Sequence, residues 1–157
     1  GGAEVSGGVR EKALGQTFTA DMSYTLTVAR FASSFRSAFP QFGNVREGDE
    51  LPYAPLHQGA LSLGVEGEQF RVAGSGNVVS AMRDRAGQGD ARPSELTDAQ
   101  LLLDVAGQLR LAPGAWLTLK ATNLTNAAYV VSRRPYGARP NQPITAMVGF
   151  RWDLGGG

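Results

Sequence analysis

Strict alternation of apolar and polar residues marks the stretch 17–28, which reads TFTADMSYTLTV. Every even position from Phe18 to Val28 is apolar, and every odd position from Thr17 to Thr27 is polar. Because successive side chains of a strand point to opposite faces, a strand here has one apolar and one polar face. A helix would mix the two sets around its circumference. We therefore predict a β-strand.

Six further stretches alternate in the same way. The C-terminal stretch is the clearest of them, with apolar residues at Ile144, Ala146, Val148, Phe150, Trp152 and Leu154. Weaker copies have their apolar positions at Ala3, Val5 and Val9; Leu61, Leu63 and Val65; Phe70, Val72 and Val78; Leu101, Leu103, Val105, Leu109 and Leu111; and Leu117, Leu119 and Ala121. Several of these seven predicted strands reach the roughly 9–11 residues that a strand needs to cross a membrane.

The connections between the predicted strands alternate in length. Short connections fall near residues 13–16, 66–68 and 112–114, and long ones near 37–51, 83–97 and 125–142. Membrane barrels have short turns on one side and long loops on the other, and this rhythm favours a barrel wall. A soluble β-sandwich, whose apolar faces meet in a core, also produces alternating strands. Alternation alone therefore leaves both folds open.

Composition narrows the chemistry. The 157 residues carry a formal net charge of +1, no cysteine and one histidine, His57. These numbers exclude a disulfide scaffold, and they disfavour a protein-ligated metal site. No basic block exceeds the pair Arg133–Arg134, so there is no electrostatic case for nucleic acid. A lone histidine at a predicted strand start gives no acid–base pair, and we expect no enzyme and no cofactor.

Three motifs occur in order along the chain. Gly48–Pro55 with His57 contains the pattern G-x-x-L-P-Y-x-P-x-H, and Leu102–Val105 follows the second long connection. Asn123-Leu124-Thr125-Asn126 with Tyr129 matches N-L-[FT]-[DN]-x-x-Y. In this order and spacing they resemble the C-terminal barrel portion of TonB-dependent outer-membrane receptors, most closely the ferric-citrate and siderophore branch.

The resemblance implies a fold and a domain organisation. The family has a barrel of about 22 strands closed by an N-terminal plug. Residues 1–154 would be the last seven strands, an all-β, antiparallel transmembrane β-barrel segment that is part of a larger barrel. Residues 155–157 would be a glycine tail, and the plug domain would be absent from this chain.

The resemblance also implies a function, namely TonB-dependent uptake of a ferric siderophore or similar iron chelate across the outer membrane of a Gram-negative bacterium. The implied partners are outer-membrane lipid and lipopolysaccharide, the ferric chelate, the barrel-assembly machinery, and the TonB complex acting through a plug. Two other functions stay open: a small self-contained outer-membrane barrel with a structural or adhesive role, and a soluble β-sandwich binding module.

Cations of the last long loop are the candidate ligand-binding residues. Guanidinium groups bind carboxylates bidentately, and ferric complexes of carboxylate siderophores are anionic. Arginines on an outer loop could equally bridge lipopolysaccharide phosphates or remain solvated. The candidate residues are Arg133, Arg134, Tyr136 and Arg139.

Other side chains receive structural interpretations. Asn123-Leu124-Thr125 has the form of a glycosylation sequon, but we interpret it as a strand-end motif. Interfacial aromatic residues are expected at Trp116, Trp152, Phe18, Phe70 and Tyr53. A polar inner wall, which in this family contacts the plug, is expected from Arg71, Asn77, Asp104, Lys120, Arg151 and Asp153.

Overall fold

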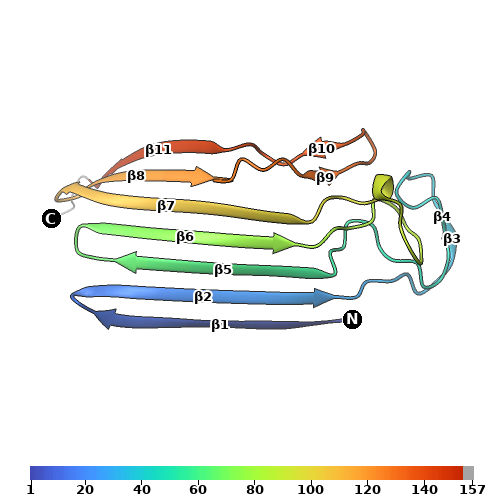
Figure 1. Cartoon of the computed structure of the whole chain (residues 1–157), viewed down its shortest axis with the longest axis horizontal. Coiled ribbons are helices and arrows are strands. Elements are labelled where there is room, and N and C mark those ends of the chain that lie inside the picture. Colours follow the sequence, from blue (N-terminus) through green and yellow to red (C-terminus); the bar gives the residue numbers. More distant parts are fainter. Residues whose placement is uncertain (154–157) are drawn as a thin grey trace.

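A seven-stranded antiparallel sheet dominates the computed structural model, which describes residues 1–153. Each long strand pairs with the next long strand along the chain, so the sheet is a meander (Figure 1). The prediction of seven strands is confirmed. Leu154, expected at the end of the last strand, and the glycine tail 155–157 lie outside the described residues. The strands are β1 (Gly2–Ala13), β2 (Gln16–Thr27), β5 (His57–Glu66), β6 (Phe70–Val79), β7 (Gln100–Ala112), β8 (Ala115–Thr122) and β11 (Thr145–Trp152).

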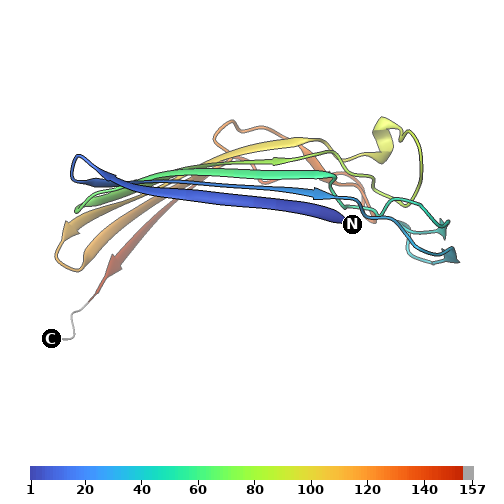
Figure 2. The ribbon, with the colours of Figure 1, turned by 90° about the horizontal axis from the view of Figure 1, so that it is seen from below.

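The sheet is a single open layer. Strands β1 and β11 form its two edges, and within residues 1–153 no second large sheet covers either face (Figure 2). The remaining elements are small: β3 (Phe35–Arg36) pairs with β4 (Asn44–Val45), β9 (Val130–Ser132) pairs with β10 (Arg139–Pro140), and η1 (Pro93–Glu95) is a 3₁₀ turn. No helix of the described chain has the length and hydrophobicity to cross a membrane. A β-sandwich requires two packed sheets, so that alternative is wrong.

Apolar side chains cover one face of the sheet and have no protein layer against them. Among residues 1–153 the only buried apolar residues are Val45 and Ala115. By contrast, the strand residues Leu63 and Val148 are 55% and 74% exposed. An apolar face of this size has to be covered by something other than these residues, because water is an unfavourable neighbour for it.

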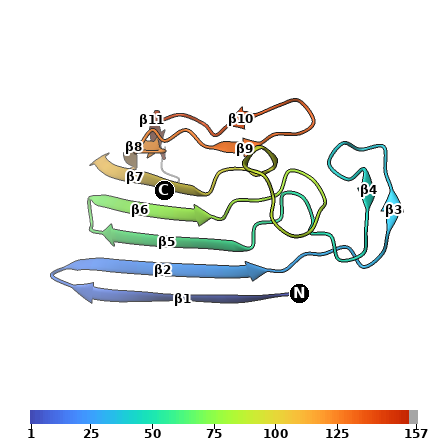
Figure 3. The same ribbon diagram turned by 45° about the vertical axis from the view of Figure 1, so that its right-hand side comes forward.

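Turns and loops segregate to opposite ends of the strands, as the connection lengths predict. Strands β1 and β2, β5 and β6, and β7 and β8 are joined at one end by two or three residues each. The first of these turns, Leu14-Gly15, has positive φ at both residues (54° and 74°), the geometry that suits a tight hairpin. The long connections 28–56, 80–99 and 123–144 gather at the other end, and β3, β4 and η1 lie among them (Figures 1 and 3).

The strand register assigns each side chain to a face, and it corrects one of the predicted interfacial residues. Trp116 lies opposite Arg110 and Arg151, and the Arg71 Cζ atom lies 5.6 Å from the centre of its ring. It therefore belongs to the polar face. Trp116 has the same parity as the polar residues Thr118 and Lys120, which indicates the same face from the sequence alone.

The other predicted interfacial residues divide into two groups. Phe18, Phe70 and Trp152 pair with apolar-face residues near the short turns, in agreement with their predicted face. Tyr53 does not belong to the sheet at all, because it lies in the first long loop, where its hydroxyl binds the last long loop. The prediction of Tyr53 as an interfacial aromatic is therefore wrong.

Candidate ligand-binding loops

Asn123 closes the base of the last long loop. It is only 4% exposed and has a φ of +52°, a left-handed conformation that asparagine tolerates better than most residues. Its Nδ2 donates to the carbonyls of Ala127 (3.0 Å) and Gln142 (2.9 Å), and its Oδ1 accepts from the Ala127 N–H at 3.1 Å. Both amide hydrogens are thus engaged inside the fold, which supports the strand-end interpretation over a glycosylation site.

Strand β7 anchors the same loop base. The Asn123 backbone N–H donates to Asp104 Oδ1 at 2.9 Å, and the Tyr129 hydroxyl donates to the Leu101 carbonyl at 3.2 Å. On the other side, Asn126 Oδ1 accepts from the Ile144 N–H at 3.0 Å, just before β11 begins. The asparagines and the tyrosine of the motif therefore all bind backbone groups, which explains why these residue types stand at this spacing.

Tyr53 joins the first long loop to the last. Its hydroxyl accepts hydrogen bonds from the backbone N–H groups of Arg133 (3.2 Å) and Arg134 (2.8 Å), and lies 3.4 Å from the Arg134 carbonyl, to which it donates. Tyr53 has a φ of +56°, so the backbone is turned at the residue that makes this contact. The tyrosine of the L-P-Y motif thus fixes the backbone of the two candidate arginines.

The side chains of Arg133 and Arg134 bind the second long loop. Arg133 Nε donates to the Leu96 carbonyl at 2.6 Å. Arg134 Nε lies 3.0 Å from Asp84 Oδ2, an ion pair whose N–H is not aligned for a hydrogen bond. Asp84 is 2% exposed, and its Oδ1 accepts no hydrogen bond from the residues that the structure describes. Both arginines therefore hold loops together.

Tyr136 and Arg139, the other two candidates, lie apart from this contact. Tyr136 is 82% exposed, and the Arg139 Cζ atom stacks 5.2 Å from the centre of its ring. A cavity of about 360 Å³ is lined by Arg133 and Arg134 together with Asp84, Ser94 and Gly137, while Tyr136 and Arg139 are not among its lining residues. The four candidates thus form two separate pairs.

A larger cavity lies between the first and second long loops, and sequence reasoning missed it. It has a volume of about 570 Å³, and its walls include Arg30, Glu50, Arg83 and Asp90. Arg83 Nε binds Glu50 Oε2 at 2.7 Å, and the Arg83 side chain is only 10% exposed. Its second guanidinium contact is with the Gly89 carbonyl. The contacts run between positions up to 33 residues apart, so neither motif nor periodicity indicates them.

Four phenylalanines form a cluster in the first long loop. Phe42 makes edge-to-face contacts with the other three, at centroid distances of 5.9–6.4 Å. Phe39 is 65% exposed at the edge of this cluster. The cluster is completed by Phe31 and Phe35.

Within residues 1–153, no group of three or more histidine, aspartate or glutamate side chains is arranged to hold a metal ion.

These features together define a class of structure. A one-layer antiparallel meander with short turns at one end, long interlocked loops at the other and one uncovered apolar face is the architecture of part of a β-barrel wall. The sheet does not close on itself, since β1 and β11 remain unpaired with each other.

Comparison with solved structures identifies the same architecture in a receptor. Two crystal structures of the ferric-catecholate import receptor Fiu from E. coli K12, in a closed and an open form, match 96% of this chain. The TM-scores are 0.57 and 0.56 at 15% and 17% sequence identity. At this identity the likeness concerns the fold, and the resemblance predicted from the motifs is confirmed at that level. The chain spans only 27% and 26% of the length of the matched receptor chains. No protein-family model and no curated protein matches the sequence.

Proposed function

We propose that residues 1–154 form the C-terminal part of the barrel of an outer-membrane receptor for TonB-dependent uptake of a ferric siderophore or similar iron chelate. The observation that carries the proposal is the fold match over 96% of the chain to a ferric-catecholate import receptor. The motifs add to it independently, because Asn123 and Tyr53 both serve the loops that such a receptor would present to its ligand.

In this proposal the two faces and two ends of the sheet have different neighbours. The uncovered apolar face contacts outer-membrane lipid and, near the loops, lipopolysaccharide. The long loops face the cell exterior, as they do in bacterial outer-membrane barrels. Energy reaches the receptor from the TonB complex through a plug domain outside this chain, and the barrel-assembly machinery inserts the barrel. The role is binding and transport, without an enzymatic step.

The ligand in this proposal is anionic, and it binds among the loop arginines. The cavity beside Arg133 and Arg134 has a volume of about 360 Å³, within the range usual for small-molecule sites. Arg139 and Tyr136 form a second, exposed contact on the same loop. Arginine is suited to carboxylate or other oxyanion groups because its N–H donors match their geometry.

Uptake measurements test the proposal. The complete reading frame that encodes this sequence is expressed in a strain without ferric-chelate receptors, and uptake of radioactive iron is measured with ferric citrate, a ferric catecholate and a ferric hydroxamate. We expect TonB-dependent uptake of at least one chelate and recovery of the protein in the outer membrane. Absence of uptake for all three, or equal uptake without TonB, would contradict the receptor role.

A loop variant tests the ligand site separately. Arg133→Gln, Arg134→Gln and Arg139→Gln together should weaken chelate binding by about tenfold or more, since each lost charged hydrogen bond is worth about 1.5–3 kcal/mol. The matched control replaces three exposed loop arginines elsewhere: Arg36, Arg46 and Arg92. Equal binding by the two triple variants would remove these residues from the site and leave the receptor role standing.

A further inference from the structure

The larger loop cavity, of about 570 Å³, lies where β2, β5 and β6 meet the first two long loops. Both loops extend from the same end of the sheet (Figure 3). Its volume is within the range usual for sites that hold drug-sized ligands. Arg133, Arg134 and Arg139, to which the proposed receptor function assigns the iron chelate, are not among its lining residues. The cavity is therefore a separate candidate site.

Backbone hydrogen bonds fix the walls of this cavity. The Thr97 N–H donates to the Met82 carbonyl at 2.8 Å, and the Met82 N–H donates to the Thr97 hydroxyl at 3.0 Å. Thr97 is 2% exposed, so this pair is shielded from water. In the first long loop, the Leu51 N–H donates to the Ala29 carbonyl at 3.1 Å. A cavity with such fixed walls binds a ligand at a lower cost in conformational entropy than a loop that must first be ordered.

Most of the side chains that line the cavity are apolar. Val28 and Leu56 remain 43% and 44% exposed, so part of this apolar surface is open to a ligand. Covering it with an apolar group is favourable, because the surface is then removed from water. The apolar lining residues are Val28, Leu51, Leu56, Met82, Leu96 and the alanines at 29, 54, 81 and 91.

The charged residues of the lining balance one another. Arg83 Nε binds Glu50 Oε2 at 2.7 Å, and the Arg83 side chain is only 10% exposed, so these two charges are already paired. Arg30 and Asp90 are both exposed, and neither forms an ion pair within residues 1–153. One guanidinium and one carboxylate are thus left for a ligand. An anionic chelate gains no net electrostatic attraction from this set.

We propose that the larger loop cavity binds a short apolar peptide with both termini free. The peptide ammonium group pairs with the Asp90 carboxylate, the peptide carboxylate accepts hydrogen bonds from the Arg30 guanidinium, and the apolar side chains pack against Leu51 and Met82. Hydrogen bonds between ionised groups of this kind are the strong ones. The proposal goes beyond the receptor function, because it adds a second class of ligand at a second site and requires no iron.

Equilibrium dialysis tests the chemistry of the ligand. The complete reading-frame product, extracted from outer membranes in detergent, is dialysed without iron against radiolabelled leucyl-leucine, N-acetyl-leucyl-leucine or leucyl-leucine amide. We expect leucyl-leucine to bind about tenfold or more tightly than either blocked peptide, because each blocked peptide lacks one charged terminus. Failure of leucyl-leucine to bind, or equal binding of all three peptides, overturns the proposal.

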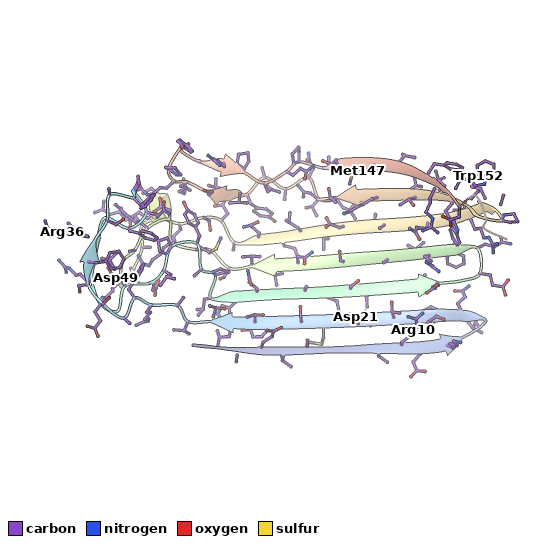
Figure 4. The ribbon with its side chains drawn as sticks, turned by 180° about the vertical axis from the view of Figure 1, so that it is seen from behind. Arg10, Asp21, Arg36, Asp49, Met147 and Trp152 are labelled. Atoms are coloured by element: carbon purple, nitrogen blue, oxygen red, sulfur yellow. The ribbon has the colours of Figure 1, made fainter. Side chains whose placement is uncertain are left out.

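Two variants assign the termini of the peptide. In Arg30→Gln, leucyl-leucine and its amide should bind equally, while the preference over the acetylated peptide remains. Asp90→Asn should remove that second preference and keep the first. The matched controls are Arg36→Gln and Glu47→Gln, which change exposed loop residues outside the cavity lining and should change neither preference. Arg36 lies on β3 at the outer end of the loops (Figure 4). Preferences that stay the same in the two cavity variants, or that change equally in the controls, overturn the proposal.

Photolabelling locates the bound peptide. Leucyl-leucine that carries a diazirine in each side chain is bound to the complete product and irradiated, and the labelled residues are identified by mass spectrometry. We expect labels on Leu51, Met82 and Leu96, and we expect excess unlabelled leucyl-leucine to remove them. Labels confined to other parts of the protein, or labels that ferric citrate displaces, overturn the proposal. Iron uptake is measured separately, so loss of the receptor role would leave this binding site standing.

Discussion

Replacing Asn123 with alanine should loosen the whole last loop, and the structure allows the cost to be divided. The largest loss is the bond from the Ala127 N–H to Asn123 Oδ1, because no other group within residues 1–153 accepts a hydrogen bond from that N–H. The two carbonyls bound by Asn123 Nδ2 keep a second donor, Asn141 Nδ2, at 3.1 Å from each. Losing the two hydrogen bonds from Asn123 Nδ2 should therefore cost little free energy.

Two terms then set the decrease in the free energy of unfolding. An unsatisfied backbone N–H costs about 1–3 kcal/mol, and we take the middle of this range because Ala127 is only half-buried. The left-handed conformation at φ +52° costs alanine about 1–2 kcal/mol more than it costs glycine. We expect Asn123→Ala to lower the free energy of unfolding by about 3 kcal/mol. Asn123→Gly, which removes the same hydrogen bonds without the backbone strain, should lower it by about 2 kcal/mol.

Urea unfolding in detergent micelles, followed by the fluorescence of Trp116 and Trp152, measures both variants. The difference between them isolates the backbone term, and the glycine variant isolates the side-chain hydrogen bonds. A loss below about 0.5 kcal/mol in both would refute the role assigned to the Asn123 amide. An equal loss in both would refute the strain argument and keep the hydrogen bonds.

Three further substitutions probe other contacts. Tyr53→Phe should raise the rate of amide hydrogen exchange at Arg133 and Arg134 at least tenfold in the folded protein, because their N–H groups lose the shared hydroxyl acceptor. Unchanged exchange rates would contradict the role assigned to the Tyr53 hydroxyl. Asp84→Ala should lower the free energy of unfolding by about 2 kcal/mol by leaving the half-buried Arg134 uncompensated, and a double-mutant cycle with Arg134→Gln should show that the two losses are not additive. Gly114→Ala should destabilise the protein more than Gly15→Ala, although φ is similar at the two positions (+76° and +74°). A Cβ at position 114 would lie 2.7 Å from the Asp153 carbonyl oxygen, whereas a Cβ at position 15 would lie in open space. Equal melting temperatures of the two variants would exclude this clash.

Periodicity predicted the strands because a shift of one residue in register would move the apolar side chains of a strand to the opposite face of the sheet. The alternation in 17–28 corresponds to β2 within one residue at each end, and the long and short connections fall where their lengths indicate. The same rule would have placed Trp116 on the polar face. Its prediction as an interfacial residue followed from its residue type, which says what a side chain tolerates but not which way it points.

The loop contacts could not be predicted in the same way. Tyr53 and Arg133 are 80 residues apart, and a single hydroxyl meets two backbone N–H groups there. Nothing in local propensity encodes such a meeting, because it depends on the relative positions of three loops. The motif around Tyr53 indicated that the tyrosine mattered, and the structure supplies the reason, which is the backbone of the last loop rather than the membrane interface.

The bond between Tyr53 and the last loop also has a consequence for the order of folding. Each long strand of the large sheet pairs with the next long strand along the chain, so pairing can proceed one strand at a time. Every connection closed in this way, the long ones 28–56, 80–99 and 123–144 included, is shorter than the span that the Tyr53 contact closes. The Tyr53 contact closes a span of 80 residues and carries little entropic penalty only after β5 to β8 have assembled between its ends. Protection of the Arg133 and Arg134 amides from hydrogen exchange should therefore appear last during refolding, and its appearance marks the completion of the sheet.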